Sequence, residues 1–150
     1  MSTLHILMAQ LNTLVGDFEG NTQKIIDALT LAESEHEMPI VVCPELTLSG
    51  YPPEDLLLRP SIALRVEQSL TTLCAAMQGS AYLVIGYPLK VGGALYNVAG
   101  VLHRGEIVAQ YRKQCLPNYQ VFDEKRYFTP GSEPCVVTIA GVAVGLTICE

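Results

Sequence analysis

The chain has 150 residues, of which 49% are hydrophobic and only 16% charged, and its formal net charge is −6. The length fits one domain, and a charged fraction below the ~25% of average soluble domains predicts apolar surface that meets further chain or another subunit. The acidic balance disfavours a nucleic-acid partner, and the longest charge-free stretch, Pro134 to Cys149, is shorter than the ~20 residues of a membrane span.

The N-terminal part alternates strand-like and helix-like segments. His5 to Leu11 is a short apolar run typical of a strand, and Asn21 is expected to cap the helix that follows. Thr22 to Glu37 carries apolar residues at three- and four-residue steps, the spacing of a helix with one packed face. Pro39 ends this helix, and the β-branched run Ile40 to Cys43 predicts a buried strand.

The middle of the chain predicts a loop, a second helix and three strands. Ser49 to Pro60 is rich in proline and is expected to be irregular, with one turn at Glu54 to Leu58. Ser61 to Gln78 has the pattern of a helix, and Arg104-Gly105 predicts a tight turn between the last two strands. The three strands are expected at Tyr82 to Tyr87, Tyr96 to His103 and Glu106 to Tyr111.

The C-terminal part begins with a long loop. Periodicity is lost after Gln114 and returns at Val136, and the loop CLPNYQVFDEKRYFTPG has about 17 residues, which favours a functional role. Val136 to Ile139 and Val142 to Ile148 predict a hairpin around Ala140-Gly141. Because no G-x-G-x-x-G fingerprint is present, these elements favour a mixed, layered α/β fold over a Rossmann fold.

The cysteines predict neither disulfides nor a zinc site. There are five of them, an odd number, without a C-x-x-C pair or a histidine at ligand spacing. Reduced thiols and an N-terminus without a basic leader favour the cytoplasm.

Three reactive side chains each lie at the end of an apolar run: Glu45, Lys113 and Cys149. Each alone has an ordinary structural explanation, namely an exposed loop glutamate, a solvated strand-edge lysine and a packed thiol. Together they supply what cleavage of an amide by a thiol requires: a proton acceptor, a positive charge for the oxyanion and a proton donor for departing ammonia. Their spacing over a hundred residues does not show that they meet.

Two long strings carry a resemblance to a known family. PELTLSGYPPEDLLLR, from Pro44 to Arg59, and YRKQCLPNYQVFDEKRYFTPG, from Tyr111 to Gly131, are followed by GLTICE at the end of the chain. Over essentially all 150 residues the chain resembles the nitrilase superfamily, and within it the glutaminase domains of glutamine-dependent NAD synthetases. The resemblance implies an α-β-β-α sandwich of the nitrilase type, here only its N-terminal part.

The resemblance also implies roles for particular residues. Glu45 corresponds to the general base, Lys113 to the oxyanion stabiliser and Cys149 to the nucleophile. Glu124 matches an additional active-site glutamate of the superfamily.

Other positions are less firmly placed by the resemblance. Tyr51 and Tyr119 are expected to line the glutamine pocket, although loop aromatics that close over the core would explain them equally well. Three positions depart from the family pattern: Cys43 replaces an aromatic residue, Cys115 a histidine or asparagine, and Gln120 a glycine. A glycine at the last position suggests a backbone with positive φ.

The function that the resemblance implies is hydrolysis of glutamine without a cofactor or metal. The ammonia would serve a synthetase domain of the same parent chain, which uses ATP and magnesium to amidate nicotinic acid adenine dinucleotide. That domain is absent here, because no SGG-x-DS loop occurs, and the 150 residues are expected to be inactive, or nearly so, by themselves. A homo-oligomer is expected. The alternatives are a stand-alone amidase for another small amide and a non-catalytic assembly module with a packed Cys149.

Overall fold

The computed structural model of the chain describes residues 3–149, which form a mixed sheet covered on both faces. The five strands of this sheet lie side by side in chain order. The first three run parallel, and the third, fourth and fifth are joined as antiparallel neighbours. The strands are β1 (Ile6–Met8), β2 (Ile40–Val42), β3 (Tyr82–Val91), β4 (Ala94–His103) and β5 (Glu106–Arg112).

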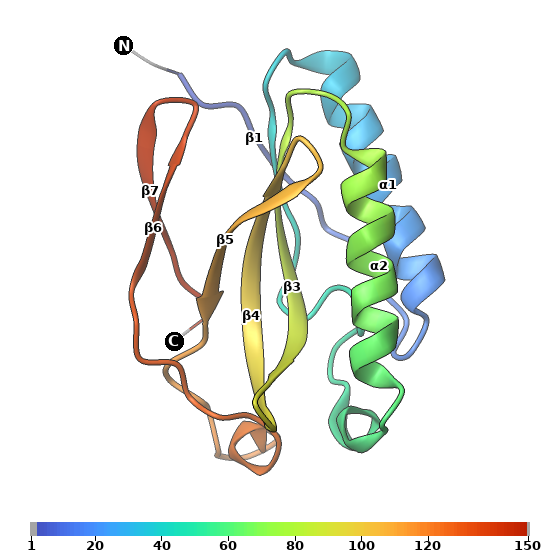
Figure 1. Cartoon of the computed structure of the whole chain (residues 1–150), viewed down its shortest axis with the longest axis vertical. Helices are drawn as coiled ribbons and strands as arrows, with labels where there is room; N and C mark the ends of the chain where they lie inside the picture. The colour runs from blue at the N-terminus through green and yellow to red at the C-terminus, as the bar shows by residue number, and fades with distance from the viewer. Residues whose placement is uncertain (1–2, 150) are drawn as a thin grey trace.

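Two helices cover one face of the sheet and a hairpin covers the other (Figure 1). The helices are α1 (Phe18–Glu35) and α2 (Ile62–Ala76), and the hairpin pairs β6 (Cys135–Ile139) with β7 (Val142–Leu146). One apolar cluster, including Leu73 and Leu83, fills the space beneath the helices, and another joins Val101 to Ile139 beneath the hairpin. These layers confirm the predicted mixed α/β class.

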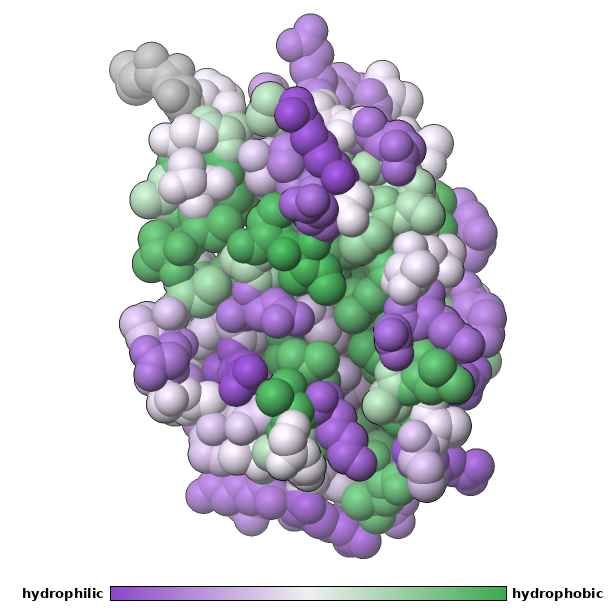
Figure 2. Space-filling view, viewed as in Figure 1, coloured by the Kyte–Doolittle hydropathy of each residue, from purple (hydrophilic) through white to green (hydrophobic). Residues whose placement is uncertain are grey.

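Apolar side chains also reach the surface. Figure 2 shows them gathered over the hairpin side of the molecule, where Val108 of β5 and Val136 of β6 are exposed. Neither helix within residues 3–149 has the length and apolar character that a membrane span requires.

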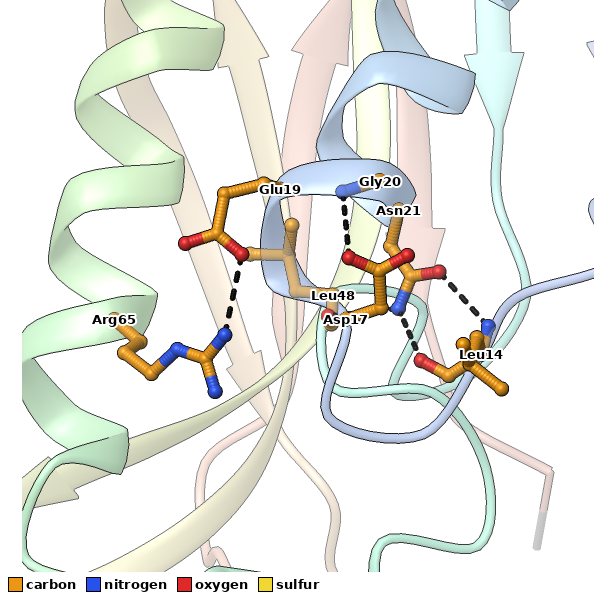
Figure 3. Close-up of polar contacts among 7 residues, drawn as sticks. All are labelled: Leu14, Asp17, Glu19, Gly20, Asn21, Leu48 and Arg65. Carbon is orange, nitrogen blue, oxygen red and sulfur yellow. Dashed lines mark hydrogen bonds and ion pairs between the residues drawn. The ribbon is translucent and has the colours of Figure 1, made fainter.

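The prediction that Asn21 caps the first helix is wrong. The helix begins at Phe18, and the Asp17 carboxylate accepts a hydrogen bond of 3.0 Å from the Gly20 N–H. Asn21 lies inside the first turn, fully buried, where its amide donates to the carbonyls of Leu14 and Leu48 and accepts from the Leu14 N–H (Figure 3). The two residues are equally good caps by type, and the contacts of Asn21 with distant loops decide between them.

Several strands end at residues other than those predicted; β1, for example, ends at Met8 and not at Leu11. β3 continues through Pro88 to Val91 instead of ending at Tyr87. Pro88 pairs with Asn97, whose carbonyl faces the β5 side and accepts from Lys113, so the missing N–H of Pro88 points away from β4. β7 ends at Leu146 and not at Ile148, which leaves Cys149 exposed in a segment beyond the strand.

The tight turns confirm the predicted hairpins. Arg104 and Gly105 have φ values of 48° and 81°, and Ala140 and Gly141 have the same pair, as two-residue hairpin turns require. Gln120 has a φ of 53°, which confirms the positive angle expected there. The short helix η1 (Glu54–Leu58) matches the predicted turn, whereas η2 (Glu124–Arg126) in the long loop was not predicted.

Candidate active site

The reactive side chains gather on the hairpin face of the sheet, where β2 and β5 end. Lys113 follows β5 directly, and its N–H donates to the Asn97 carbonyl on β4 over 2.8 Å. Side chains alternate along a strand, so Asn97 and Lys113 share a face with Ala99 and Tyr111 of the hairpin-side cluster.

A close approach to β3 sets the position of Glu45. The loop after β2 is held by hydrogen bonds from the Cys43 N–H to the Val84 carbonyl and from the Leu48 N–H to the Gly86 carbonyl. A Cβ atom at Gly86 would overlap the backbone nitrogen of Leu46, so only glycine lets this loop lie against the strand. Glu45 is therefore placed by a rigid element.

Lys113 lies between two carboxylates. Its Nζ donates to Glu45 Oε1 over 2.8 Å and to Glu124 Oε1 over 2.9 Å. Asn97 Nδ2 donates to the same oxygen of Glu45 over 2.7 Å. The Lys113 side chain is 1% exposed, which rules out a solvated strand-edge lysine, and the Glu45 and Glu124 side chains are 22% and 9% exposed.

Burial and pairing act in opposite directions on these charges. Burial by itself lowers the pKa of Lys113, but its hydrogen bonds to Glu45 and Glu124 and their charges outweigh that effect and raise the pKa above its ordinary value. Burial raises the pKa of Glu124, and the Lys113 ammonium offsets only part of the rise. The site thus holds a fixed positive charge beside a carboxylate that is costly to ionise.

Cys149 lies next to Glu45. The two residues line a shared pocket of about 160 Å³, whose walls include Ala99 and Ile148. Cys149 is exposed within the described residues and has a φ of 50°. A thiol in this position has a carboxylate within the same small space.

A larger pocket of about 300 Å³ opens beside Glu124, between η1 and the long loop. Tyr51 lines it together with Phe122 and Arg126. Burial raises the pKa of Tyr51, and the charges of Glu45 and Glu124 raise it further, so Tyr51 lies within reach of the charged cluster. Tyr119 is not in the wall of this pocket; it is exposed and packs edge-on against the Phe122 ring.

The structure therefore brings together Glu45, Lys113, Glu124 and Cys149, with Tyr51 beside them and Tyr119 outside. Asn97 was missed by sequence reasoning, although a polar residue inside the apolar run ALYNVAGVL was a usable signal. Residues 3–149 contain no group of three or more His, Cys, Asp and Glu side chains suited to a metal ion.

Comparison with known proteins identifies the family. The pattern of the carbon-nitrogen hydrolases matches residues 7–150. The chain belongs to the carbon-nitrogen hydrolase family. Among curated family members, the glutamine-dependent NAD(+) synthetase of Xanthomonas campestris pv. campestris is 51% identical over 99% of this chain, and that of Thermotoga maritima is 45% identical over all of it. The chain spans 27% and 26% of these relatives, about a quarter of their length.

Solved structures agree with this placement among the carbon-nitrogen hydrolases. The glutamine-dependent NAD+ synthetase of Acinetobacter baumannii, bound to ADP, is 35% identical with a TM-score of 0.91, over 96% of this chain and 27% of that one. A variant of the amidase from Nesterenkonia sp. AN1, with acrylamide added at its active site cysteine, is 25% identical with a TM-score of 0.85, over 98% of this chain and 57% of that one. The resemblance to the nitrilase superfamily and its NAD synthetases is confirmed.

Proposed function

We propose that the chain is the N-terminal part of the glutaminase domain of a glutamine-dependent NAD synthetase and that it hydrolyses the side-chain amide of glutamine. The observation that carries this proposal is the buried Lys113 ammonium, held between Glu45 and Glu124 beside the pocket that Glu45 shares with Cys149. The names of the related synthetases support glutamine as the substrate.

Formation of a thioester is the first half of the reaction. The Cys149 sulfur attacks the carbonyl carbon of the glutamine amide while its proton passes to Glu45. Lys113 and a backbone N–H stabilise the negative charge that develops on the carbonyl oxygen. The C–N bond then breaks, and ammonia leaves with the proton from Glu45. The raised pKa of Lys113 suits this role because the ammonium keeps its charge throughout.

Hydrolysis of the thioester is the second half. Glu45 takes a proton from a water molecule, and the resulting hydroxide attacks the thioester carbonyl. The sulfur leaves with the proton held by Glu45, and glutamate is released. The same carboxylate therefore acts as base and then as acid in both halves.

The larger pocket supplies the contacts to the rest of the substrate. Tyr51 and Glu124 line it and lie beside the charged cluster, so they bind glutamine. Tyr119 packs against the Phe122 ring, which lines this pocket.

The proposed role of the whole protein is based on its relatives. The glutaminase step uses no cofactor, and a synthetase domain of the same parent chain consumes the ammonia with ATP and magnesium to amidate nicotinic acid adenine dinucleotide. The fourfold greater length of the relatives supports such a domain. The protein works in the cytoplasm as a homo-oligomer.

A glutamine analogue that carries a diazo-ketone tests the proposal. The natural full-length protein is incubated with the analogue, and the modified peptide is identified by mass spectrometry. A single adduct on Cys149, with glutamine hydrolysis lost in Cys149→Ala and kept in Cys115→Ala, is the expected result. Cys115 is the matched control because it is exposed and lies outside the shared pocket. An unmodified Cys149 with intact glutamine hydrolysis would refute the assignment.

A stand-alone amidase for another small amide is the second candidate, favoured by the structural similarity to the Nesterenkonia enzyme. The two candidates differ in substrate preference. A kcat/KM for glutamine well above those for acetamide and propionamide supports the glutaminase, and the reverse order supports the amidase.

A further inference from the structure

Asn97 contacts Glu45 directly although it neither attacks the substrate nor carries a proton. It lies on β4, in the middle of the sheet, and is 1% exposed. Its Nδ2 donates to Glu45 Oε1 over 2.7 Å, and Lys113 Nζ donates to the same oxygen over 2.8 Å. Two donors from neighbouring parts of the sheet thus converge on one carboxylate oxygen.

This convergence makes the two oxygens of Glu45 unequal. Neither an amide N–H nor an ammonium can accept a proton, so Oε1 is occupied by donors in both protonation states of the glutamate. Among the hydrogen bonds of residues 3–149, none ends on Oε2. The oxygen that remains open to a proton is therefore Oε2.

Asn97 is better suited than Lys113 to fix the orientation of Glu45. Lys113 reaches Glu45 on a long, flexible stem. The short side chain of Asn97 comes from a strand that is paired on both sides. Its donor is neutral, so it bonds Oε1 whether Glu45 is a carboxylate or a carboxylic acid.

The other end of the amide argues against a purely structural role. Asn97 Oδ1 is buried and has no hydrogen-bond partner among the described residues. Buried amides that serve stability normally have both ends paired, as Asn21 does with Leu14 and Leu48. Among the described residues, the hydrogen bonding of Asn97 therefore comes from its donor end, which faces Glu45.

We propose that Asn97 is a positioning residue that fixes Glu45 so that Oε2, and not Oε1, exchanges the proton with Cys149. This inference rests on the proposed function for its chemistry, in which the proton leaves the thiol as the sulfur attacks. The geometry it needs is the shared hydrogen bonding of Oε1 and the common pocket of Glu45 and Cys149.

Substitution of Asn97 in the natural full-length protein tests the inference. Asn97→Leu removes the donor with the same number of side-chain heavy atoms, and Asn97→Ser replaces the amide donor by a shorter hydroxyl without a bulky apolar group, so the test does not depend on the folding of a single variant. We expect kcat for glutamine hydrolysis to fall roughly 10- to 100-fold per folded molecule, with KM changed less than about twofold, because a misplaced base slows the chemistry and not the binding.

Asn21→Leu is the matched control. It removes an equally buried asparagine amide whose hydrogen bonds go to backbone groups of Leu14 and Leu48 and not to Glu45, Lys113 or Glu124. It is expected to lower stability and to leave kcat and KM per folded molecule unchanged. If the Asn97 variants behave like Asn21→Leu in kcat and KM, the positioning role is refuted.

Alkylation of Cys149 separates this inference from the proposed function. Iodoacetamide forms an S–C bond with loss of iodide and needs no glutamine, so its rate reports the transfer of the thiol proton alone. At pH 6 to 7 we expect Asn97→Leu and Asn97→Ser to slow alkylation of Cys149 about tenfold and to leave Cys115 unchanged. If the Asn97 variants slow alkylation but the wild-type protein does not hydrolyse glutamine, the positioning role is supported and the proposed function is refuted. If the Asn97 variants leave alkylation unchanged and the wild-type protein hydrolyses glutamine, the positioning role is refuted and the proposed function stands.

Discussion

Two buried asparagines of this chain, Asn21 and Asn97, have different roles. Asn21, 0% exposed, closes the junction between α1 and two loops with hydrogen bonds at both ends of its amide (Figure 3). Asn97, 1% exposed, donates to the Glu45 carboxylate and leaves its acceptor unpaired. Asn21 is tied to backbone groups that hold the fold together, whereas Asn97 is tied to a carboxylate of the proposed active site.

The surroundings of the two residues differ in the same way. Near Asn21 the partners are backbone groups, and the nearby ion pair between Arg65 and Glu19 lies at the surface. Near Asn97 a buried ammonium faces two carboxylates, and Glu124 Oε2 has no hydrogen-bond partner among the described residues. Such a cluster costs desolvation energy that a structural site avoids.

Removal of the Lys113 charge should have the largest effect. Lys113→Met leaves Glu45 and Glu124 facing each other without a cation, and we expect a loss of about 3 kcal/mol in the free energy of unfolding at pH 7. Glutamine hydrolysis should fall roughly 10²- to 10³-fold or more, because the oxyanion loses its counter-charge. Urea denaturation and initial rates of glutamate release measure the two effects.

The loss of stability should shrink as the pH falls toward 5. Burial already raises the pKa of Glu124, and without the ammonium it rises further, so protonation relieves the repulsion. Lys90→Met, in an exposed part of β3, is the control and should change neither quantity. A Lys113→Met protein as stable as the wild type at pH 7 would show that the cluster is not strained.

Substitution of Asn21 should lower stability and leave catalysis unchanged. Asn21→Leu leaves backbone groups of Leu14 and Leu48 unpaired, and we expect it to cost about 2 kcal/mol of folding free energy. Catalysis per folded molecule should not change, because none of these groups contacts the cluster. Thermal melting followed by circular dichroism measures the loss of stability. A variant with normal stability but reduced kcat would contradict the structural role of Asn21.

The sequence predicted the elements better than it predicted the site. Periodicity located both helices and the strands, and glycine after arginine or alanine located two of the hairpin turns, but not the turn between β3 and β4. The convergence of Glu45 with Lys113 came from the resemblance alone, because their spacing carries no information on whether they meet. Asn97 could not be placed at all, since its contact with Glu45 depends on the register in which β4 pairs with β3 and β5.

The first helix shows why the ends of helices are difficult to predict from sequence. Asp17 and Asn21 are both good caps by type, and local sequence does not distinguish them. The choice follows from the contact of Asn21 with the Leu48 carbonyl, 27 residues away along the chain. Long-range hydrogen bonds of this kind lie outside any reading of local pattern.

The pH dependence of stability should reveal the cost of the Glu124 charge. Its pKa is raised in the folded protein, so the stability it provides is complete below its ordinary pKa and is lost as the pH rises through the folded value. Glu124→Gln lacks this titration. We therefore expect its stability relative to wild type to improve steadily from about pH 4.5 upward and then to level off, as measured by urea denaturation between pH 4 and 8.

Glu133→Gln, at an exposed position, is the control for that series. Its stability relative to wild type gives the baseline for the loss of one carboxylate. A Glu124→Gln difference that depends on pH no more than this baseline would mean that the Glu124 carboxylate is ionised without cost, and that the cluster resembles an ordinary surface ion pair.

The smallest effect is expected in the long loop between β5 and β6, which contains Gln120. Gln120 has a φ of 53°, an angle that glycine adopts without strain, so Gln120→Gly should raise the free energy of unfolding by up to about 1 kcal/mol. Gln23→Gly, at an exposed position in α1, should lower it by about the same amount, because glycine disfavours a helix interior. Melting temperatures that move in opposite directions support backbone strain at Gln120, and a decrease for both would mean that its side chain holds the loop through a contact of its own.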